Sequence, residues 1–147
     1  MKLYKDFHLD DPWDSADNKK LIERMPEIYR GLNDKLAREG KTTFLVPIGD
    51  RTFFSNLEGM RFREVTDGLS NTIVAVDAAD ESAVIWTKPD DLLLDPKQPL
   101  RGLVGHIPHG IQILMGDGSV RIISKEIDPK TLRAIFTING GESASDF

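Results

Sequence analysis

The segment from Gly105 to Ser124 places the strongest constraint on the fold of this chain. A turn sequence, Gly116-Asp117-Gly118-Ser119, separates two stretches rich in branched side chains. Asp-Gly sequences supply the backbone conformations that a tight turn between antiparallel strands needs. Along residues 111–115 the side chains alternate, with Gln112 and Leu114 on one face and Ile111, Ile113 and Met115 on the other. The return strand alternates in the same way over residues 120–123. The segment therefore predicts a β-hairpin.

The rest of the chain changes from helical to strand patterns after Gly40. The spacing of apolar residues predicts a helix over residues 16–25, capped by Asp14-Ser15 and ended by Pro26, and a second helix between Met25 and Leu36. Runs of β-branched and aromatic residues predict strands at 42–46, 71–77 and 83–86, with the last two joined as a hairpin. Asp128-Pro129 predicts a final helix that ends at Asn139-Gly140-Gly141 and buries Leu132, Ile135 and Phe136.

These patterns predict one α+β domain, in which an N-terminal helix packs on an antiparallel sheet. Residues 1–12 form an extension, 13–40 the helical part and 41–127 the sheet. Within the sheet region, residues 89–99 are expected to form an acidic loop, and residues 128–147 supply the short final helix and a tail. A chain of 147 residues is long enough for a single core, and it contains no cysteine. A disulfide framework, a thiolate zinc site and a cysteine nucleophile are therefore excluded.

Charge is distributed unevenly along the chain, whose net charge is −5. Between residues 64 and 96 there are eight acidic residues and one lysine, Lys88. Such a surface repels phosphate backbones, so we expect no nucleic-acid partner. A binding module for calcium or for a basic partner is an alternative, with Asp90, Asp91 and Asp95 as candidate ligands. A solvated loop is the simpler interpretation, because the alternating aspartates of a calcium loop are absent.

The chain shows no signal for export or membrane insertion in its own residues. Its first residues carry charges where a signal peptide needs an apolar core. The longest apolar runs, such as Ile73–Val76 and Ile113–Met115, are far shorter than a bilayer span. We therefore expect a soluble chain without a signal peptide or a membrane span.

Three residues around the hairpin could form a metal site. His106, His109 and Asp117 could supply nitrogen and oxygen ligands to zinc, and such a site could serve a metal-dependent hydrolase. The simpler interpretation makes Asp117 a turn residue, with His106 bonded to the hairpin and His109 facing water. We therefore expect no metal, no cofactor and no catalytic residue.

Other candidates for chemistry are weak. Ser70 and Ser119 are possible nucleophiles, but neither lies in a Gly-x-Ser-x-Gly sequence, and Ser70 with Asn71 is better placed to cap backbone groups. Trp86 follows two apolar strand residues, so we expect it to be buried with its indole N–H bonded.

Three stretches of the chain carry a family resemblance: Asp67-Gly68-Leu69-Ser70-Asn71-Thr72-Ile73, Trp86-Thr87-Lys88-Pro89 and His106 to Ser124. They resemble a large bacterial family of prepilin-like proteins, a domain of unknown function marked by a histidine, nine residues and Asp-Gly. Here ten residues separate His106 from Asp117. Members of the family begin with a prepilin leader and a long apolar helix, which this sequence does not contain.

The resemblance extends from about Trp13 to Glu142 and implies a pilin-head-like globular domain at the cell envelope or outside the cell. It implies a non-enzymatic structural or interaction role, with protein partners in a pilus-like or envelope assembly. The residues that would mark the family, with structural roles, are Asp67, Gly68, Ser70, Asn71, Thr72, His106, Asp117 and Gly118.

Overall fold

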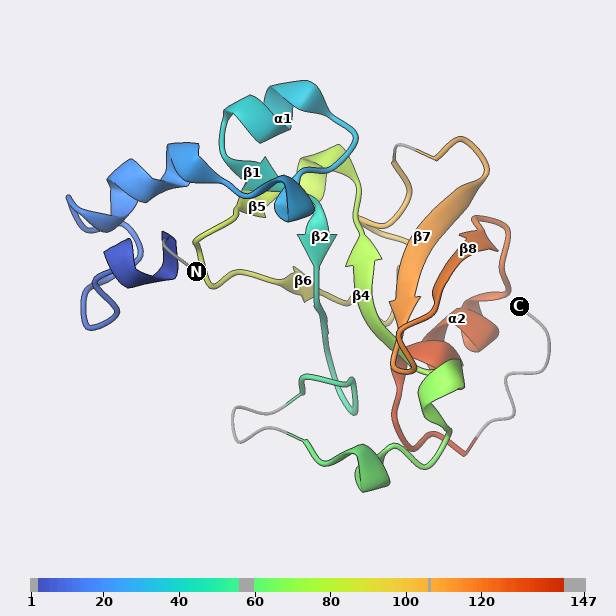
Figure 1. Ribbon diagram of the computed structural model, residues 1–147. Coiled ribbons are helices and arrows are strands. Elements are labelled where there is room, and N and C mark those ends of the chain that lie inside the picture. The colour runs from blue at the N-terminus through green and yellow to red at the C-terminus, as the bar shows by residue number, and fades with distance from the viewer. Residues whose placement is uncertain (1–2, 56–59, 106, 142–147) are drawn as a thin grey trace.

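A four-stranded antiparallel sheet with one helix on its face forms the centre of the molecule (Figure 1). The computed structural model describes residues 3–55, 60–105 and 107–141. The sheet has the order β2-β4-β7-β8, made of β2 (Phe44–Leu45), β4 (Ile73–Asp77), β7 (Gly110–Met115) and β8 (Val120–Ser124). Helix α2 (Pro129–Phe136) covers one side of it. The predicted α+β class is confirmed.

The predicted hairpin is confirmed in position. Strands β7 and β8 pair antiparallel, with Gln112 opposite Ile122. Gly118 donates its amide to the Met115 carbonyl at 2.9 Å and adopts a φ of +85°, which favours glycine at this position. On β7, the three residues that share the inward face are each 1% exposed: Ile111, Ile113 and Met115. The alternation in the sequence therefore identified the core face correctly.

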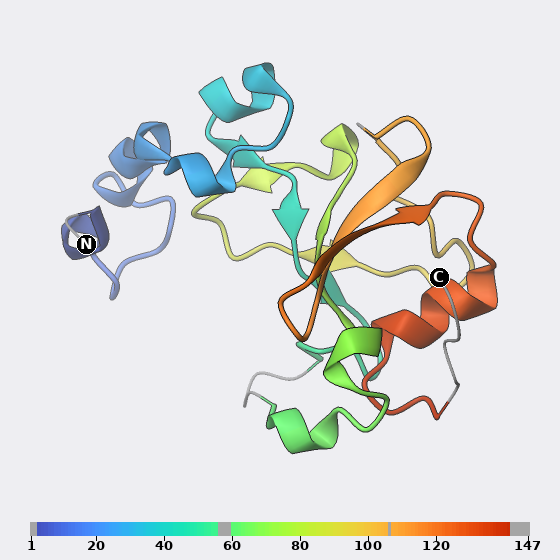
Figure 2. The same cartoon turned by 45° about the vertical axis from the view of Figure 1, so that its right-hand side comes forward.

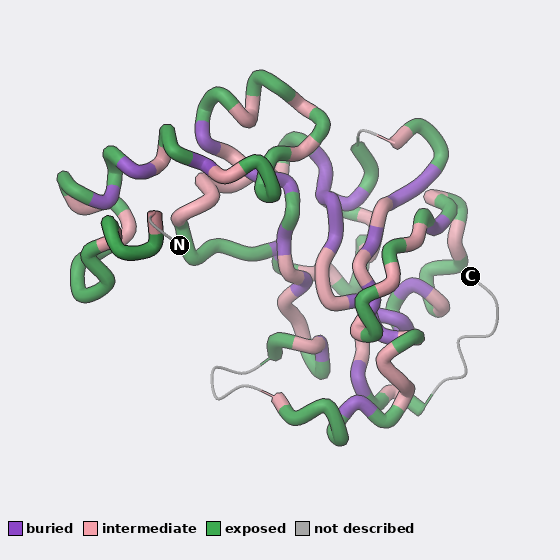
Figure 3. The backbone as a smooth tube through the Cα atoms, viewed as in Figure 1, coloured by how far each residue is buried: buried purple, intermediate pink, exposed green. Residues whose placement is uncertain are grey.

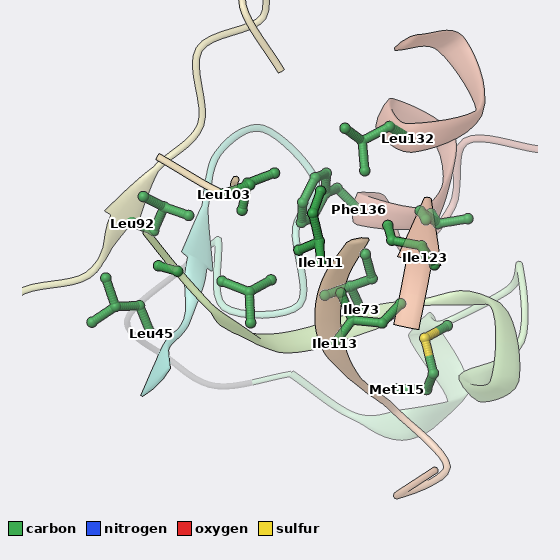
Figure 4. Packing of buried hydrophobic residues seen from close by; sticks show 13 residues of the cluster. Leu45, Ile73, Leu92, Leu103, Ile111, Ile113, Met115, Ile123, Leu132 and Phe136 are labelled. Carbon is green, nitrogen blue, oxygen red and sulfur yellow. The ribbon is translucent and has the colours of Figure 1, made fainter. Parts of the chain in front are cut away.

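The hydrophobic core lies between this sheet and α2 (Figure 4). As predicted, α2 buries Leu132, Ile135 and Phe136, and Asp128 caps its N-terminus. The helix ends at Phe136, before the predicted glycines, because the chain then becomes extended. Thr137 bridges Thr52 there, and the Ile138 amide donates to the Arg51 carbonyl at 2.9 Å.

Two short strand pairs lie outside the central sheet, and they correct two predictions. β5 (Val84–Ile85) pairs antiparallel with β1 (Lys41–Thr42), so the predicted hairpin between residues 71–77 and 83–86 is wrong. β6 (Leu92–Leu93) lies inside the predicted acidic loop and pairs parallel with β3 (Pro47–Ile48).

Both corrections arise because the segment after Gly40 changes partners every three residues. It pairs first with β5, then with β4 and then with β6, so the predicted strand 42–46 is divided between β1 and β2, and β3 follows it. Beyond β4, the amides of Ala78 and Ala79 donate to Thr43 and Gly102. The short 3₁₀ helix η6 (Asp80–Ser82) then leads the chain to β5.

The N-terminal region is helical, but its helices are short and do not cover the central sheet. It contains η1 (Leu3–Asp6), η2 (Asn18–Arg24), η3 (Glu27–Tyr29) and α1 (Asp34–Arg38). Figure 2 shows the N-terminal end on the side away from α2, and Figure 3 shows that most of this region is exposed. The place expected for an N-terminal helix on the sheet is therefore taken by α2.

Trp86 attaches this N-terminal region to the rest of the molecule. Its indole N–H donates to the Ile22 carbonyl at 2.9 Å, as predicted, but the residue is half-buried and not buried as we expected, because it lies outside the central core. Its ring stacks on Tyr29 with centroids 5.6 Å apart, and Phe7 meets it edge-on at 5.8 Å. An aromatic cluster thus replaces the helix-on-sheet packing that we predicted.

Within the described part of the chain, the longest helix is α2 with eight residues, and none has the length and apolar character needed to cross a bilayer.

The cap at Asp128 makes a pH-dependent contribution that can be measured. Its carboxylate accepts hydrogen bonds from the amides of Thr131 and Lys130, and these hold the pKa of Asp128 below its ordinary value. The stability gained from the ionised carboxylate is therefore present above the unfolded pKa of about 3.9 and is lost as pH falls through the lower folded pKa.

We expect Asp128→Asn to keep the cap but to melt below the wild type at neutral pH, because asparagine carries no charge near the helix N-terminus. The two melting temperatures, followed by circular dichroism at decreasing pH, should converge on acidification. A difference that stays constant across this range would contradict the assignment.

Candidate functional site

The segment from Asp67 to Thr72 lies directly against the turn of the β7–β8 hairpin. The Gly116 amide donates to the Thr72 carbonyl at 2.9 Å, and the Asp117 amide donates to the Leu69 carbonyl at 3.2 Å. The two strongest parts of the sequence resemblance therefore meet in space, at the Met115 end of β7.

Asp67 connects the same segment to the chain that follows α2. Its carboxylate accepts hydrogen bonds from the amides of Gly140 at 2.6 Å and Gly141 at 3.1 Å. Its own amide donates to the Ile138 carbonyl at 3.2 Å. The sequence indicated only a turn at Asp67-Gly68, because contacts over more than 70 residues leave no local pattern.

Thr72 and Asn71 complete this junction. Thr72 is fully buried, and its hydroxyl donates to the Gly68 carbonyl at 3.1 Å and lies 3.5 Å from the Thr137 carbonyl. The Asn71 side chain donates to the Asp67 carbonyl at 2.9 Å. These polar side chains bond to the backbone, as capping groups do, and Ser70 lies exposed beside them on η5 (Leu69–Asn71).

Asp117 serves the turn in which it lies. Its Oδ1 accepts hydrogen bonds from the Ser119 hydroxyl at 2.7 Å and the Ser119 amide at 2.9 Å. These bonds hold the pKa of Asp117 below its ordinary value. Ser119, one of the two candidate nucleophiles, is therefore a turn residue that donates its hydroxyl proton to a carboxylate.

The zinc candidates do not come together. His109 precedes β7 and Asp117 follows it, so the six residues of the strand separate them. A strand of that length spans about 20 Å, which is far beyond the distance between two ligands of one metal ion. His106 lies outside the described residues. The geometry thus removes the pair His109 and Asp117 from any hydrolase centre.

The calcium candidates also do not come together, because Asp90 and Asp95 contact different partners. The Asp90 carboxylate contacts the Lys88 ammonium at 2.6 Å, which lowers its pKa, and the Asp95 carboxylate accepts from the Lys97 amide at 2.8 Å. Strand β6 lies between Asp91 and Asp95. Among the residues that the structure describes, no group of three or more histidine and acidic side chains is placed to hold a metal.

A groove on the outer side of α2 is the feature that the sequence did not indicate. It encloses about 610 Å³ between α2, the turn Gly49–Thr52 and the loop 94–99. Its cationic side chains are Arg51, Lys130 and Arg133. The helical spacing of Lys130, Arg133 and Thr137 could have predicted a shared face. It could not have predicted that two loops from distant parts of the sequence lie beside that face.

No protein-family model, curated protein or solved structure matches the chain. Function must therefore be argued from the contacts described above.

Proposed function

We propose that this chain is a non-enzymatic structural or interaction domain, similar to the globular head of a prepilin-like protein and acting with protein partners at the cell envelope. The observation that carries the proposal is the use made of the marker residues. Asp67, Thr72 and Asp117 direct their side chains to backbone groups or to a neighbouring turn residue. These structural contacts explain the presence of the three residues without a role in binding a substrate.

Among the candidates that the structure describes, no reaction centre is assembled, which agrees with this proposal. The candidate metal ligands His109 and Asp117 lie at opposite ends of β7. Ser70 lies at the Met115 end of the strand, because its neighbour Leu69 accepts from the Asp117 amide. His109, at the Gly110 end, is thus about 20 Å from this serine as well, and it cannot act as its base.

The structural role of the marker residues predicts a loss of stability when Asp67 is changed. We expect Asp67→Ala to lower the free energy of unfolding by about 1–3 kcal/mol, because two backbone amides lose a charged acceptor. Urea unfolding followed by circular dichroism measures this difference. Asp91→Ala is the matched control, because Asp91 is exposed, and its effect should stay within about 0.5 kcal/mol.

The location at the envelope is tested separately in cells that express the gene from its own promoter. Fractionation and detection with an antibody should find the protein with envelope or extracellular proteins. Recovery in the cytosol alone, or an Asp67→Ala variant as stable as the wild type, would contradict the proposal.

A further inference from the structure

The groove beside α2 has the dimensions of a small-molecule site. Its volume of about 610 Å³ falls within the range of known ligand pockets. It is lined by residues of α2, of the loop 94–99 and of the turn Gly49–Thr52. All three elements are held in place by backbone hydrogen bonds or by packing of α2 on the core.

The interior of the groove is largely apolar. Leu94, Pro96 and Pro99 line it from the loop, and Ala134 and Phe136 line it from the helix. The two prolines restrict the loop backbone, so this wall is stiff without a ligand. An apolar body could therefore bind here without much ordering of the protein.

Cationic side chains surround this apolar surface. Arg133 and Lys130 lie one turn apart on α2, and both are exposed. Arg133 donates from Nη1 to the Pro96 carbonyl at 3.3 Å, which leaves its other N–H groups available to a ligand. The groove also contains two carboxylates, and each has a cationic neighbour: Asp50 lies 3.5 Å from Arg51 Nε, and Asp95 lies 3.9 Å from Arg101 Nη1.

Arg51 occupies an unusual backbone conformation. Its φ of +56° is in the left-handed region, which is unfavourable for a residue other than glycine. Its carbonyl accepts from the Ile138 amide at 2.9 Å, and the neighbouring Thr52 bridges Thr137. The protein thus holds an arginine of the groove lining in a conformation that a glycine would adopt more easily. Retained backbone strain of this kind is concentrated at functional sites.

We propose that this groove binds a small organic anion, with its apolar body against Leu94, Pro96 and Pro99 and its carboxylate-like group at Lys130 and Arg133. The chain carries a net charge of −5, yet two exposed cations, Lys130 and Arg133, lie together beside this apolar surface. This binding site goes beyond the structural role proposed above, and either can fail without the other.

The test is a titration of the ¹⁵N-labelled full chain, followed by amide chemical shifts. Three probes separate the contributions: 4-phenylbutyrate, the neutral 4-phenyl-1-butanol with the same apolar body, and inorganic phosphate. We expect saturable shifts with 4-phenylbutyrate, confined to residues 49–52, 94–96 and the outer face of α2, and at least about fivefold weaker binding of the other two probes.

Single substitutions test which cationic side chains bind the carboxylate of 4-phenylbutyrate. We expect Lys130→Gln and Arg133→Gln each to weaken 4-phenylbutyrate binding by about fivefold, whereas Lys35→Gln, which removes the same charge from α1, leaves it unchanged. Melting temperatures confirm that all three variants fold. In the titrations, the proposal is overturned if 4-phenylbutyrate gives no saturable shift, if its shifts lie outside the groove, or if the alcohol or phosphate binds equally well. Among the variants, it is overturned if all three substitutions have equal effects.

Discussion

Ile135→Ala is expected to lower the free energy of unfolding by about 2–5 kcal/mol. Ile135 is 0% exposed and lies on the inward side of α2, in the cluster shared with β4 and β7. Truncation removes apolar contacts and leaves a cavity that neither the sheet nor the helix can easily close. Since domains of this size are stable by only about 5–15 kcal/mol, the change is a large fraction of the total.

Urea unfolding followed by circular dichroism measures this effect, with the dependence on urea concentration expected to stay unchanged. Ile122→Ala removes the same atoms from β8, where the isoleucine is 64% exposed, and should cost less than about 0.5 kcal/mol. Similar losses for the two variants would show that α2 does not pack on the sheet as described.

Gly105→Ala is expected to cost about 1–3 kcal/mol. A Cβ at this position would lie 2.7 Å from the Ala79 Cα and 3.2 Å from the Ala79 Cβ. Ala79 is buried, and its amide donates to the Gly102 carbonyl at 2.8 Å, so its backbone cannot move aside without losing that bond. Because the clash involves backbone atoms, it cannot be relieved by a low-energy movement of a side chain.

Gly49→Ala is the matched control for this change. The nearest atom to its new Cβ would be 3.4 Å away, which is an ordinary contact. Thermal unfolding of the two variants beside the wild type should show a marked loss for Gly105→Ala and a small change for Gly49→Ala. A Gly105→Ala variant that melts with the wild type would contradict the close approach between residues 79 and 105.

The candidate site was only partly predictable. Asp117-Gly118 was correctly interpreted as a turn, because a tight turn between two strands is determined by neighbouring residues. The hydrogen bonds that the Gly140 and Gly141 amides donate to Asp67 were not predicted. Nothing near Asp67 in the sequence indicates which distant amides will approach it. The groove was missed for the same reason, because its walls come from three separate segments.

The sequence alone determined the elements whose stability is local. The β7–β8 hairpin follows from alternation around a glycine-containing turn, and α2 follows from a capping aspartate, a proline and helical spacing. The shared face of Ile111, Ile113 and Met115 on β7 and the buried face of α2 were predicted, because hydrophobic periodicity is a property of the segment itself.

Only the tertiary structure decided which partner each short strand takes. The strands β1, β2 and β3 contain two residues each, which is too few for alternation to specify a face or a partner. Their pairing with β5, β4 and β6 is fixed by the backbone donors and acceptors that the folded core brings within reach. The N-terminal region likewise packs on Trp86, whereas α2 covers the sheet.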